Sequence, residues 1–164
     1  LAKSELEIAQ NERGIESIYG SIDTFDPGNR KWDIVGIFQS IDHFLDPKAA
    51  LTKVREWLNP DGLLIIDICE LRHMIRLRKS VEAACKLDHP FGFTSPVMAS
   101  MLEIVGFESL LSVTSTAIGK SVFLCRKSSA QRNTLPSQDT VIDLLAIAHR
   151  SRLDFTIHQS RASA

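Results

Sequence analysis

The sequence has 164 residues, of which 44% are hydrophobic and 24% are charged, and its formal net charge is −1. A chain of this length can form one domain with a buried core, and its near-neutral charge gives no field that would attract nucleic acid or an anionic membrane. The apolar runs, such as the one at 63–66, are too short to cross a bilayer.

The cysteines and the first residues give expectations about location and completeness. Cys69, Cys85 and Cys125 form no CxxC pair and are odd in number, which suits a reducing compartment better than a disulfide framework. No basic-then-apolar signal segment opens the chain, so we expect a cytoplasmic protein. The sequence starts at Leu1 rather than at Met and is helical in pattern from the second residue, so we expect a piece of a longer chain.

The first part of the chain predicts a helix, a short strand and a turn. Residues 2–12 place apolar side chains among charges at helical spacing, and Gly14 follows where a helix would end. Residues 15–19 are a strand candidate, and the Asp-Pro-Gly-Asn run at 26–29 is typical of a turn. Residues 34–38 are almost continuously apolar, which predicts a strand covered on both faces.

The clearest helix of the sequence begins at Pro47. Asp46 can cap this helix, and the missing N–H of a proline costs nothing at the first helical position. The Asn-Pro-Asp-Gly run at 59–62 predicts a turn, and residues 63–68 predict a second buried strand. Strand, helix and strand with short joints predict a βαβ unit with a right-handed crossover in a parallel sheet.

The next part of the chain predicts two helices followed by a hairpin. Residues 71–87 have the apolar spacing of one helix, and Ser95-Pro96 begins another that Gly106 closes. Residues 107–114 and 120–126 predict strands that a short joint pairs as an antiparallel hairpin.

The chain therefore divides into three parts by composition. Residues 1–127 form the predicted domain, and the polar residues 128–140 predict a linker. Residues 141–164 are expected to form a helical tail or the start of a second module.

In this order, the elements of residues 1–127 resemble the C-terminal two-thirds of a class I S-adenosylmethionine-dependent methyltransferase of the branch that acts on small molecules. The closing hairpin matches the reversed last strand of that family's sheet. In the first of three matching segments Ile41-Asp42-His43 stands where the family has Leu-Glu-His, and in the second Asp61 replaces the first glycine of a Pro-Gly-Gly turn. The segments are WDIVGIFQSIDHFLDP, AALTKVREWLNPDGLLIIDI and HPFGFTSPVMASMLEIVGF.

The resemblance implies an α/β fold, a Rossmann-like three-layer sandwich whose sheet is mostly parallel with a C-terminal antiparallel hairpin. It also implies methyl transfer from S-adenosylmethionine to a small-molecule acceptor. The family's glycine-rich first loop, which lets the backbone approach the cofactor closely, has no counterpart in this sequence. In the family's sheet the first two strands lie between the strand candidate at 15–19 and the strand at 34–38, so we expect an N-terminally incomplete domain that is inactive as this chain alone.

Three residues are candidates for the cofactor side of the site. The resemblance implies an acidic residue near the adenine shortly after the third strand, and Asp23 is the candidate, with a turn-capping aspartate as the alternative. Phe38 and Gln39 stand at the C-terminal end of a parallel strand, where open α/β sheets bind ligands. By resemblance they face the methionine end of the cofactor, and the alternative is exposure through their place at a strand end alone.

Two histidines are candidates for the acceptor side. His43 could accept a substrate proton, since an imidazole titrates near neutral pH. Methyl transfer depends mainly on alignment of the nucleophile with the methyl carbon, however, and the alternative is a histidine that starts a helix or packs. His89 lies in a loop that the resemblance places over the substrate side, and plain loop polarity is its alternative.

The sequence offers weaker signals for metals and for charged partners. Cys69 with His73, and Cys85 with His89, have a spacing that could bind zinc, but their apolar surroundings and the lack of zinc-ribbon spacing lead us to predict no metal site. A basic cluster is either a solvated helix face or a site for a phosphorylated or carboxylated substrate. Without interleaved aromatic residues it does not favour RNA, so we expect neither nucleic acid nor membrane as a partner. The cluster consists of Arg72, His73, Arg76, Arg78 and Lys79.

Two other interpretations stay open. A non-catalytic remnant or interaction domain would keep the fold without binding the cofactor, and the missing glycine-rich loop favours it. A nicotinamide-binding Rossmann domain needs the same loop and does not explain the Ile-Asp-His and His-Pro-Phe segments.

Overall fold

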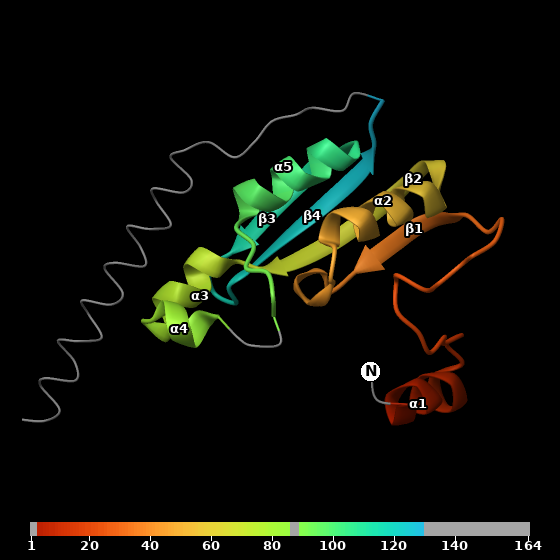
Figure 1. Ribbon diagram of the computed structural model, residues 1–164, viewed down its shortest axis with the longest axis horizontal. Coiled ribbons are helices and arrows are strands. Elements are labelled where there is room, and N and C mark those ends of the chain that lie inside the picture. Colours follow the sequence, from red (N-terminus) through yellow and green to blue (C-terminus); the bar gives the residue numbers. More distant parts are fainter. Residues whose placement is uncertain (1–2, 86–88, 130–164) are drawn as a thin grey trace, which may run out of the picture. The chain divides into compact units, whose positions relative to one another are not determined.

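The computed structural model of the protein describes residues 3–85 and 89–129. The chain forms two compact units, Leu1–Arg30 and Lys31–Ala164. The second unit contains the sheet and the helices that pack on it, and it therefore contains the core (Figure 1).

The unit Leu1–Arg30 consists of one helix followed by turns. Helix α1 (Lys3–Arg13) confirms the predicted helix and ends at Gly14, which has a φ of +62° and donates its N–H to the Gln10 carbonyl. The predicted strand at 15–19 is wrong: these residues carry no strand pairing, and Tyr19 is 63% exposed. A strand is stable only when a neighbouring strand forms hydrogen bonds with its backbone groups. Among the described residues no strand pairs with residues 15–19.

The unit Lys31–Ala164 is built on a four-stranded sheet. Its strands are β1 (Trp32–Ile37), β2 (Leu58–Cys69), β3 (Phe107–Ser115) and β4 (Lys120–Lys127), in the order β1-β2-β4-β3. Strands β1 and β2 are parallel, whereas β4 is antiparallel to both of its neighbours. The predicted α/β architecture and the C-terminal antiparallel hairpin are confirmed, and among the described residues the sheet is mixed rather than mostly parallel, with one parallel and two antiparallel pairings.

Helix α2 (Pro47–Trp57) connects the two parallel strands and completes the predicted βαβ unit. The Asp46 side chain accepts a hydrogen bond from the N–H of Ala49, and Pro47 occupies the first turn, as the sequence predicted. The Asn-Pro-Asp-Gly run at 59–62, predicted as a turn before the strand, lies within β2. It forms a bulge near the start of β2, where the pairing jumps from Trp32 with Leu58 to Ile34 with Leu63.

The single helix predicted over 71–87 is wrong. The structure has α3 (Leu71–Arg78) and α4 (Val81–Ala84), separated by Lys79 and Ser80. Lys79 adopts a left-handed backbone with a φ of +56°, and the Ser80 hydroxyl accepts a hydrogen bond from the N–H of Ala83. The serine therefore starts a new helix although the apolar spacing continues through it.

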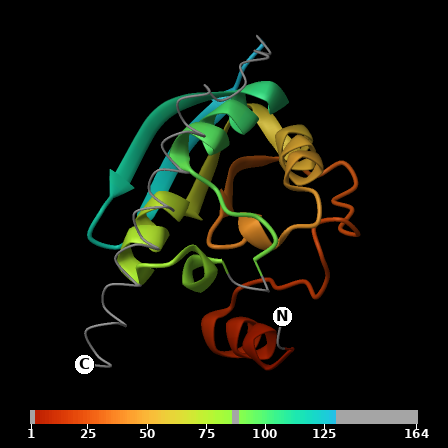
Figure 2. The ribbon, with the colours of Figure 1, turned by 60° about the vertical axis from the view of Figure 1, so that its left-hand side comes forward.

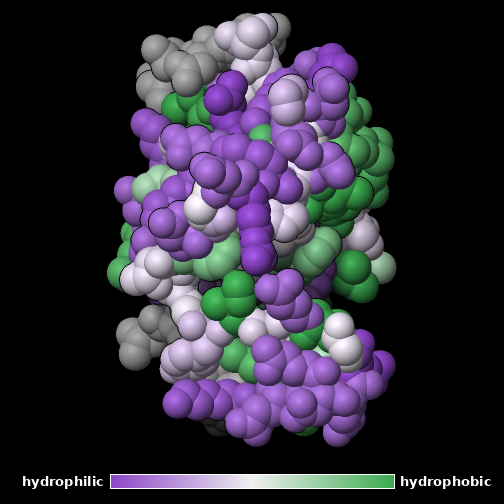
Figure 3. Space-filling model, turned by 90° about the vertical axis from the view of Figure 1, so that its right-hand side faces the viewer, coloured by the Kyte–Doolittle hydropathy of each residue, from purple (hydrophilic) through white to green (hydrophobic). Residues whose placement is uncertain are grey.

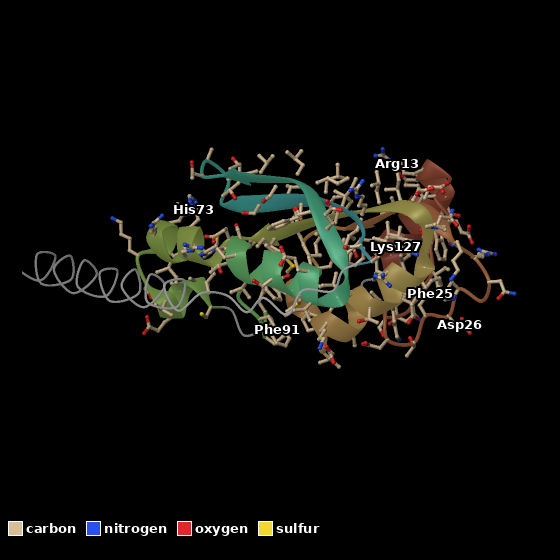
Figure 4. The ribbon with its side chains drawn as sticks, turned by 90° about the horizontal axis from the view of Figure 1, so that it is seen from above. Arg13, Phe25, Asp26, His73, Phe91 and Lys127 are labelled. Atoms are coloured by element: carbon tan, nitrogen blue, oxygen red, sulfur yellow. The ribbon has the colours of Figure 1, made fainter. Side chains whose placement is uncertain are left out.

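Helix α5 (Ser95–Val105) ends at Gly106, whose φ is +90°. Arg55 of α2 fastens this end, because its guanidinium donates to the carbonyls of Gly106 and Ser128, each at 3.0 Å. Nearby, at the end of β4, Lys127 donates to the Leu58 carbonyl, and burial together with the positive charges of Arg55 and Lys31 lowers its pKa (Figure 4). These contacts join α2, α5 and the sheet at one end.

Helices α2 and α5 lie over the same face of the sheet (Figures 1 and 2). Their apolar side chains form the core with those of β2 and β4, including Leu51, Leu64, Met98 and Phe123, each at most 1% exposed. The other face is open within the described part of the Lys31–Ala164 unit, and Figure 3 shows apolar side chains along the edge of this side. The open face includes Ile34, Leu111, Val113 and Val122, which are 59%, 55%, 52% and 40% exposed.

The prediction that β1 is covered on both faces is therefore wrong for the described residues. Ile34 lies on the open face, whereas Ile37 is 6% exposed on the covered one. The predicted tail at 141–164 and nearly all of the predicted linker at 128–140 lie outside the described residues. Within residues 3–85 and 89–129, every helix is too short or too polar to span a membrane.

Candidate active site

The candidate site forms at the carboxyl ends of β1 and β2. Because these strands are parallel and Ile37 pairs with Ile66, their C-terminal ends meet at the same edge of the sheet. Strand β1 is followed by Phe38 and Gln39, and then by the short 3-10 helix η1 (Ile41–His43). Open α/β sheets bind ligands at such an edge, which is where the sequence predicted the site.

Gln39 is held in an uncommon backbone conformation at this edge. Its φ is +49°, a value that residues with a side chain seldom adopt. Its N–H donates to Asp67 Oδ1 at 2.5 Å, and Lys120 Nζ lies 3.4 Å from the other oxygen of the same carboxylate. Asp67 is 6% exposed, so the end of β2 carries a buried carboxylate that fixes the turn after β1.

Asp67 was not among the predicted site residues. The signal for it was available, since this aspartate is the one charged residue in the run LLIIDIC. A carboxylate within an apolar strand needs a partner or a ligand, because burial of an unpaired charge is costly.

Phe38 lies over its own strand. A Cβ atom at Gly36 would stand 2.5 Å from Phe38 Cε2, so the glycine leaves the space that the ring occupies. The ring is nevertheless 59% exposed, and it presents an aromatic surface next to the turned backbone of Gln39. The structure thus brings Phe38 and Gln39 together at the strand end, as predicted.

The structure also brings both predicted histidines together with Asp42. His89 Nδ1 lies 2.5 Å from Asp42 Oδ2, and the rings of His43 and His89 are 4.2 Å apart between centroids. Asp42 is buried, His89 is half-buried and His43 is exposed. A carboxylate on one ring nitrogen fixes the orientation of an imidazole and stabilises its protonated form.

A small pocket opens beside this pair. Apart from Asp42 and His89, its lining is apolar or carries sulfur. Gly92 forms part of the wall and packs closely on Leu71, since a Cβ atom at 92 would lie 2.8 Å from Leu71 Cδ2. Phe91 comes from the segment before α5 (Figure 4). The full lining is Asp42, Cys69, Leu71, Met74, Ala84, Cys85, His89, Phe91 and Gly92.

Asp23 lies in the other unit, Leu1–Arg30, where it is an exposed residue of the turn at 22–24. Its contact with the adenine stays a prediction. In the basic cluster, Arg72 pairs with Glu70 at 3.4 Å, and Arg76, Arg78 and Lys79 are exposed. The cluster therefore has the features of a solvated helix face, and its binding of a charged substrate is untested.

Comparison with known proteins agrees with this geometry. A family model described as "Methyltransferase domain" matches residues 7–112. A S-adenosylmethionine-dependent methyltransferase from Clostridium acetobutylicum ATCC 824 has a similar structure, with a TM-score of 0.61 and 13% identity over 77% of this chain and 71% of that one. No curated protein matches the chain.

Two further proteins of similar structure carry names that describe different acceptors. The mitomycin 7-O-methyltransferase MmcR has a TM-score of 0.60 and 15% identity, over 76% of this chain and 39% of that one. The small RNA methyltransferase HEN1 has a TM-score of 0.52 and 21% identity, over 71% of this chain and 17% of that one. At such identities the likeness shows the fold alone.

The sheet order, the parallel βαβ unit and these structural similarities identify the Rossmann-like fold that S-adenosylmethionine-dependent methyltransferases have. The family match covers more than half of the sequence, so the chain belongs to the methyltransferase-domain family. The resemblance to a methyltransferase that was inferred from the sequence is confirmed.

Proposed function

We propose that this protein transfers a methyl group from S-adenosylmethionine to a small-molecule acceptor. The observation that carries the proposal is the arrangement at one sheet edge. Phe38 and Gln39 end a parallel strand, and the Asp42–His89 pair follows directly beside an apolar pocket. The first pair would face the cofactor and the second would face the acceptor.

The cofactor side rests on Phe38 and Gln39, with Asp23 as the residue proposed for the adenine. An exposed aromatic ring suits an organic cation, and a sulfonium is one. The Asp67 carboxylate holds the Gln39 backbone in place before any ligand arrives, which lowers the ordering cost of binding. The chain itself has no glycine-rich loop, so we propose that this part of the site comes from a longer form of the protein.

The acceptor side rests on His89, with His43 next to it. When bound, the cofactor supplies a methyl carbon already activated by its sulfonium. The acceptor's lone pair forms a bond to this carbon while the carbon–sulfur bond breaks, and the acceptor's proton must leave. His89 is proposed to take that proton, with Asp42 stabilising the resulting imidazolium at Nδ1. Alignment of the two reacting atoms supplies most of the rate.

The pocket supports a small and largely apolar acceptor that carries a hydroxyl or an amine. Leu71, Met74 and Phe91 would pack on its carbon skeleton, while Asp42 and His89 stand where a polar group would be recognised. An RNA acceptor would instead need stacking surfaces and a basic path, and the basic residues of α3 have no aromatic side chains among them.

The test is calorimetric titration with S-adenosylmethionine on the longest natural form of the protein. Phe38→Ala is expected to weaken binding at least about tenfold, the loss of roughly 1.4 kcal/mol. Ile34→Ala is the matched control, because Ile34 lies in the preceding strand and is equally exposed, at 59%. It should bind as the wild type does.

If the longest form binds no cofactor, the chain is the non-catalytic remnant. Equal effects of the two substitutions would remove Phe38 from the site.

A further inference from the structure

One carboxylate and two imidazoles converge where η1 meets the segment before α5. The ligand atoms of Asp42, His43 and His89 all lie within 4.8 Å of one another. Among the residues that the structure describes, this is the one group of three histidine, cysteine or acidic side chains with ligand atoms so close. We infer that the three side chains form a binding site for a divalent first-row transition metal, with zinc as the leading candidate.

The backbone holds two of the three ligands in place. Asp42 and His43 are consecutive in η1, where the N–H of His43 donates to the Ser40 carbonyl at 3.0 Å and the N–H of Phe44 donates to Ile41. Two neighbouring ligands on one rigid turn lose little freedom when a metal binds. His89 completes the group from a segment 47 residues away in sequence.

The distances between the ligand atoms are compatible with a metal site. Ligand bonds of zinc are about 2.0–2.2 Å long, so two ligand atoms of a tetrahedral site lie about 3.3 Å apart. Asp42 Oδ2 and His89 Nδ1 now share a hydrogen bond of 2.5 Å, and the group as a whole stays within 4.8 Å. Side-chain rotations that move these ligand atoms by about 1 Å would therefore make room for an ion.

The donor set selects the kind of metal. Two imidazoles with one carboxylate suit zinc and its transition-metal neighbours, whereas magnesium and calcium prefer oxygen ligands alone. The Asp42 carboxylate is buried, which strengthens its attraction for a cation. The exposed edge of His43 leaves a route from solvent, and three protein ligands leave a position for water or for a substrate atom.

This inference does not depend on the proposed function. A metal on His89 Nδ1 would replace the contact with Asp42 that stabilises the imidazolium in the proposed function, so bound zinc is expected to inhibit methyl transfer. Metal binding itself can be measured without cofactor or acceptor. Failure of one proposal is therefore distinguishable from failure of the other.

The experiment is equilibrium dialysis of the chelator-treated chain against zinc, followed by metal analysis, with cobalt as a spectroscopic probe. We expect one zinc per chain and visible cobalt bands of a site with nitrogen and oxygen ligands. His43→Ala, His89→Gln and Asp42→Asn should each weaken zinc binding at least about tenfold. Loss of a side chain that only orients a metal ligand already weakens metal binding by about that factor, so loss of a ligand should cost at least as much. Circular dichroism verifies that each variant is folded.

Two control variants separate this site from its rivals. His73→Ala removes a histidine outside the group and should leave zinc binding unchanged. Cys85→Ser tests the alternative pair of Cys85 with His89, since Cys85 lines the same pocket. Absence of stoichiometric zinc, or loss of binding in Cys85→Ser with retention in His43→Ala, would overturn the inference.

Discussion

The backbone N–H of Gln39 donates to the buried carboxylate of Asp67 across 2.5 Å. Through this bond the end of β2 determines how the chain leaves β1, and so where η1 presents Asp42 and His43. Both sides of the proposed site therefore depend on the side chain of Asp67.

Replacement of this carboxylate tests its role. Asp67→Ala leaves the N–H of Gln39 without its acceptor and the amine of Lys120 without its partner. A hydrogen bond to a charged group contributes about 1.5–3 kcal/mol, so we expect the free energy of unfolding to fall by about that amount. Urea denaturation measures it. Asp61→Ala, at an exposed position of the same strand, should cost no more than about 0.5 kcal/mol, and an equal loss would contradict the prediction.

The space at Gly36 gives a second prediction. In Gly36→Ala the new Cβ would lie 2.5 Å from Phe38 Cε2, so the ring must move or the strand must shift. We expect a loss of about 1–3 kcal/mol in the wild-type background, the usual cost of overpacking. In the Phe38→Ala background the same change should cost nothing, because the obstacle is gone. A double-mutant cycle by urea denaturation measures this coupling, and additive effects would show that the ring does not occupy this space.

Local signals in the sequence predicted much of the fold. Asp46 and Pro47 begin α2 where expected, because a cap and a proline act within one turn. The strand predicted at 15–19 failed because strand formation depends on a partner that no local pattern supplies. The break between α3 and α4 was missed because the Ser80 cap competes with an apolar spacing that continues past it.

The site was predicted only in part. His43 and His89 were singled out individually, but nothing in a single sequence indicates that Asp42 and His89, 47 positions apart, share a hydrogen bond, or that the His43 ring lies beside His89. The lone charge of Asp67 in an apolar strand was a signal for a buried carboxylate, but its partner could not be predicted, because that partner is a backbone N–H. Both contacts depend on the tertiary fold, which the spacing of residues in the sequence does not indicate.

Glu70 caps two helices at once, which gives a third prediction. Its Oε2 accepts from the N–H of His73 in α3, and its Oε1 accepts from the N–H of Ser95 in α5. Loss of one cap costs about 1 kcal/mol, so Glu70→Ala is expected to cost about 2 kcal/mol or more in thermal or urea unfolding. Thr94 is the natural comparison, since its hydroxyl is buried without a hydrogen-bond partner. Thr94→Val should be neutral or stabilising, and a loss as large as that of Glu70→Ala would be the contrary result.

Cys125 makes the stability of the protein depend on pH in the alkaline range. Burial raises the pKa of its thiol from about 9.0 to about 11, partly offset by a hydrogen bond with Ser109. Above pH 9 the unfolded chain releases this proton while the folded chain keeps it, so stability present below pH 9 is lost as the pH rises to about 11. A shift of this size corresponds to about 2–3 kcal/mol.

The measurement compares the wild type with Cys125→Val, which keeps an apolar side chain in the core but cannot ionise. The difference between their free energies of unfolding should be constant from pH 7 to about 8.5, and it should then move against the wild type by about 2–3 kcal/mol towards pH 11. Cys85→Ser is the control for the loss of a thiol outside the core, because Cys85 is exposed. A difference between wild type and Cys125→Val that stays flat to pH 11 would mean that the thiol ionises alike in both states, and that water reaches it between β4 and the helices.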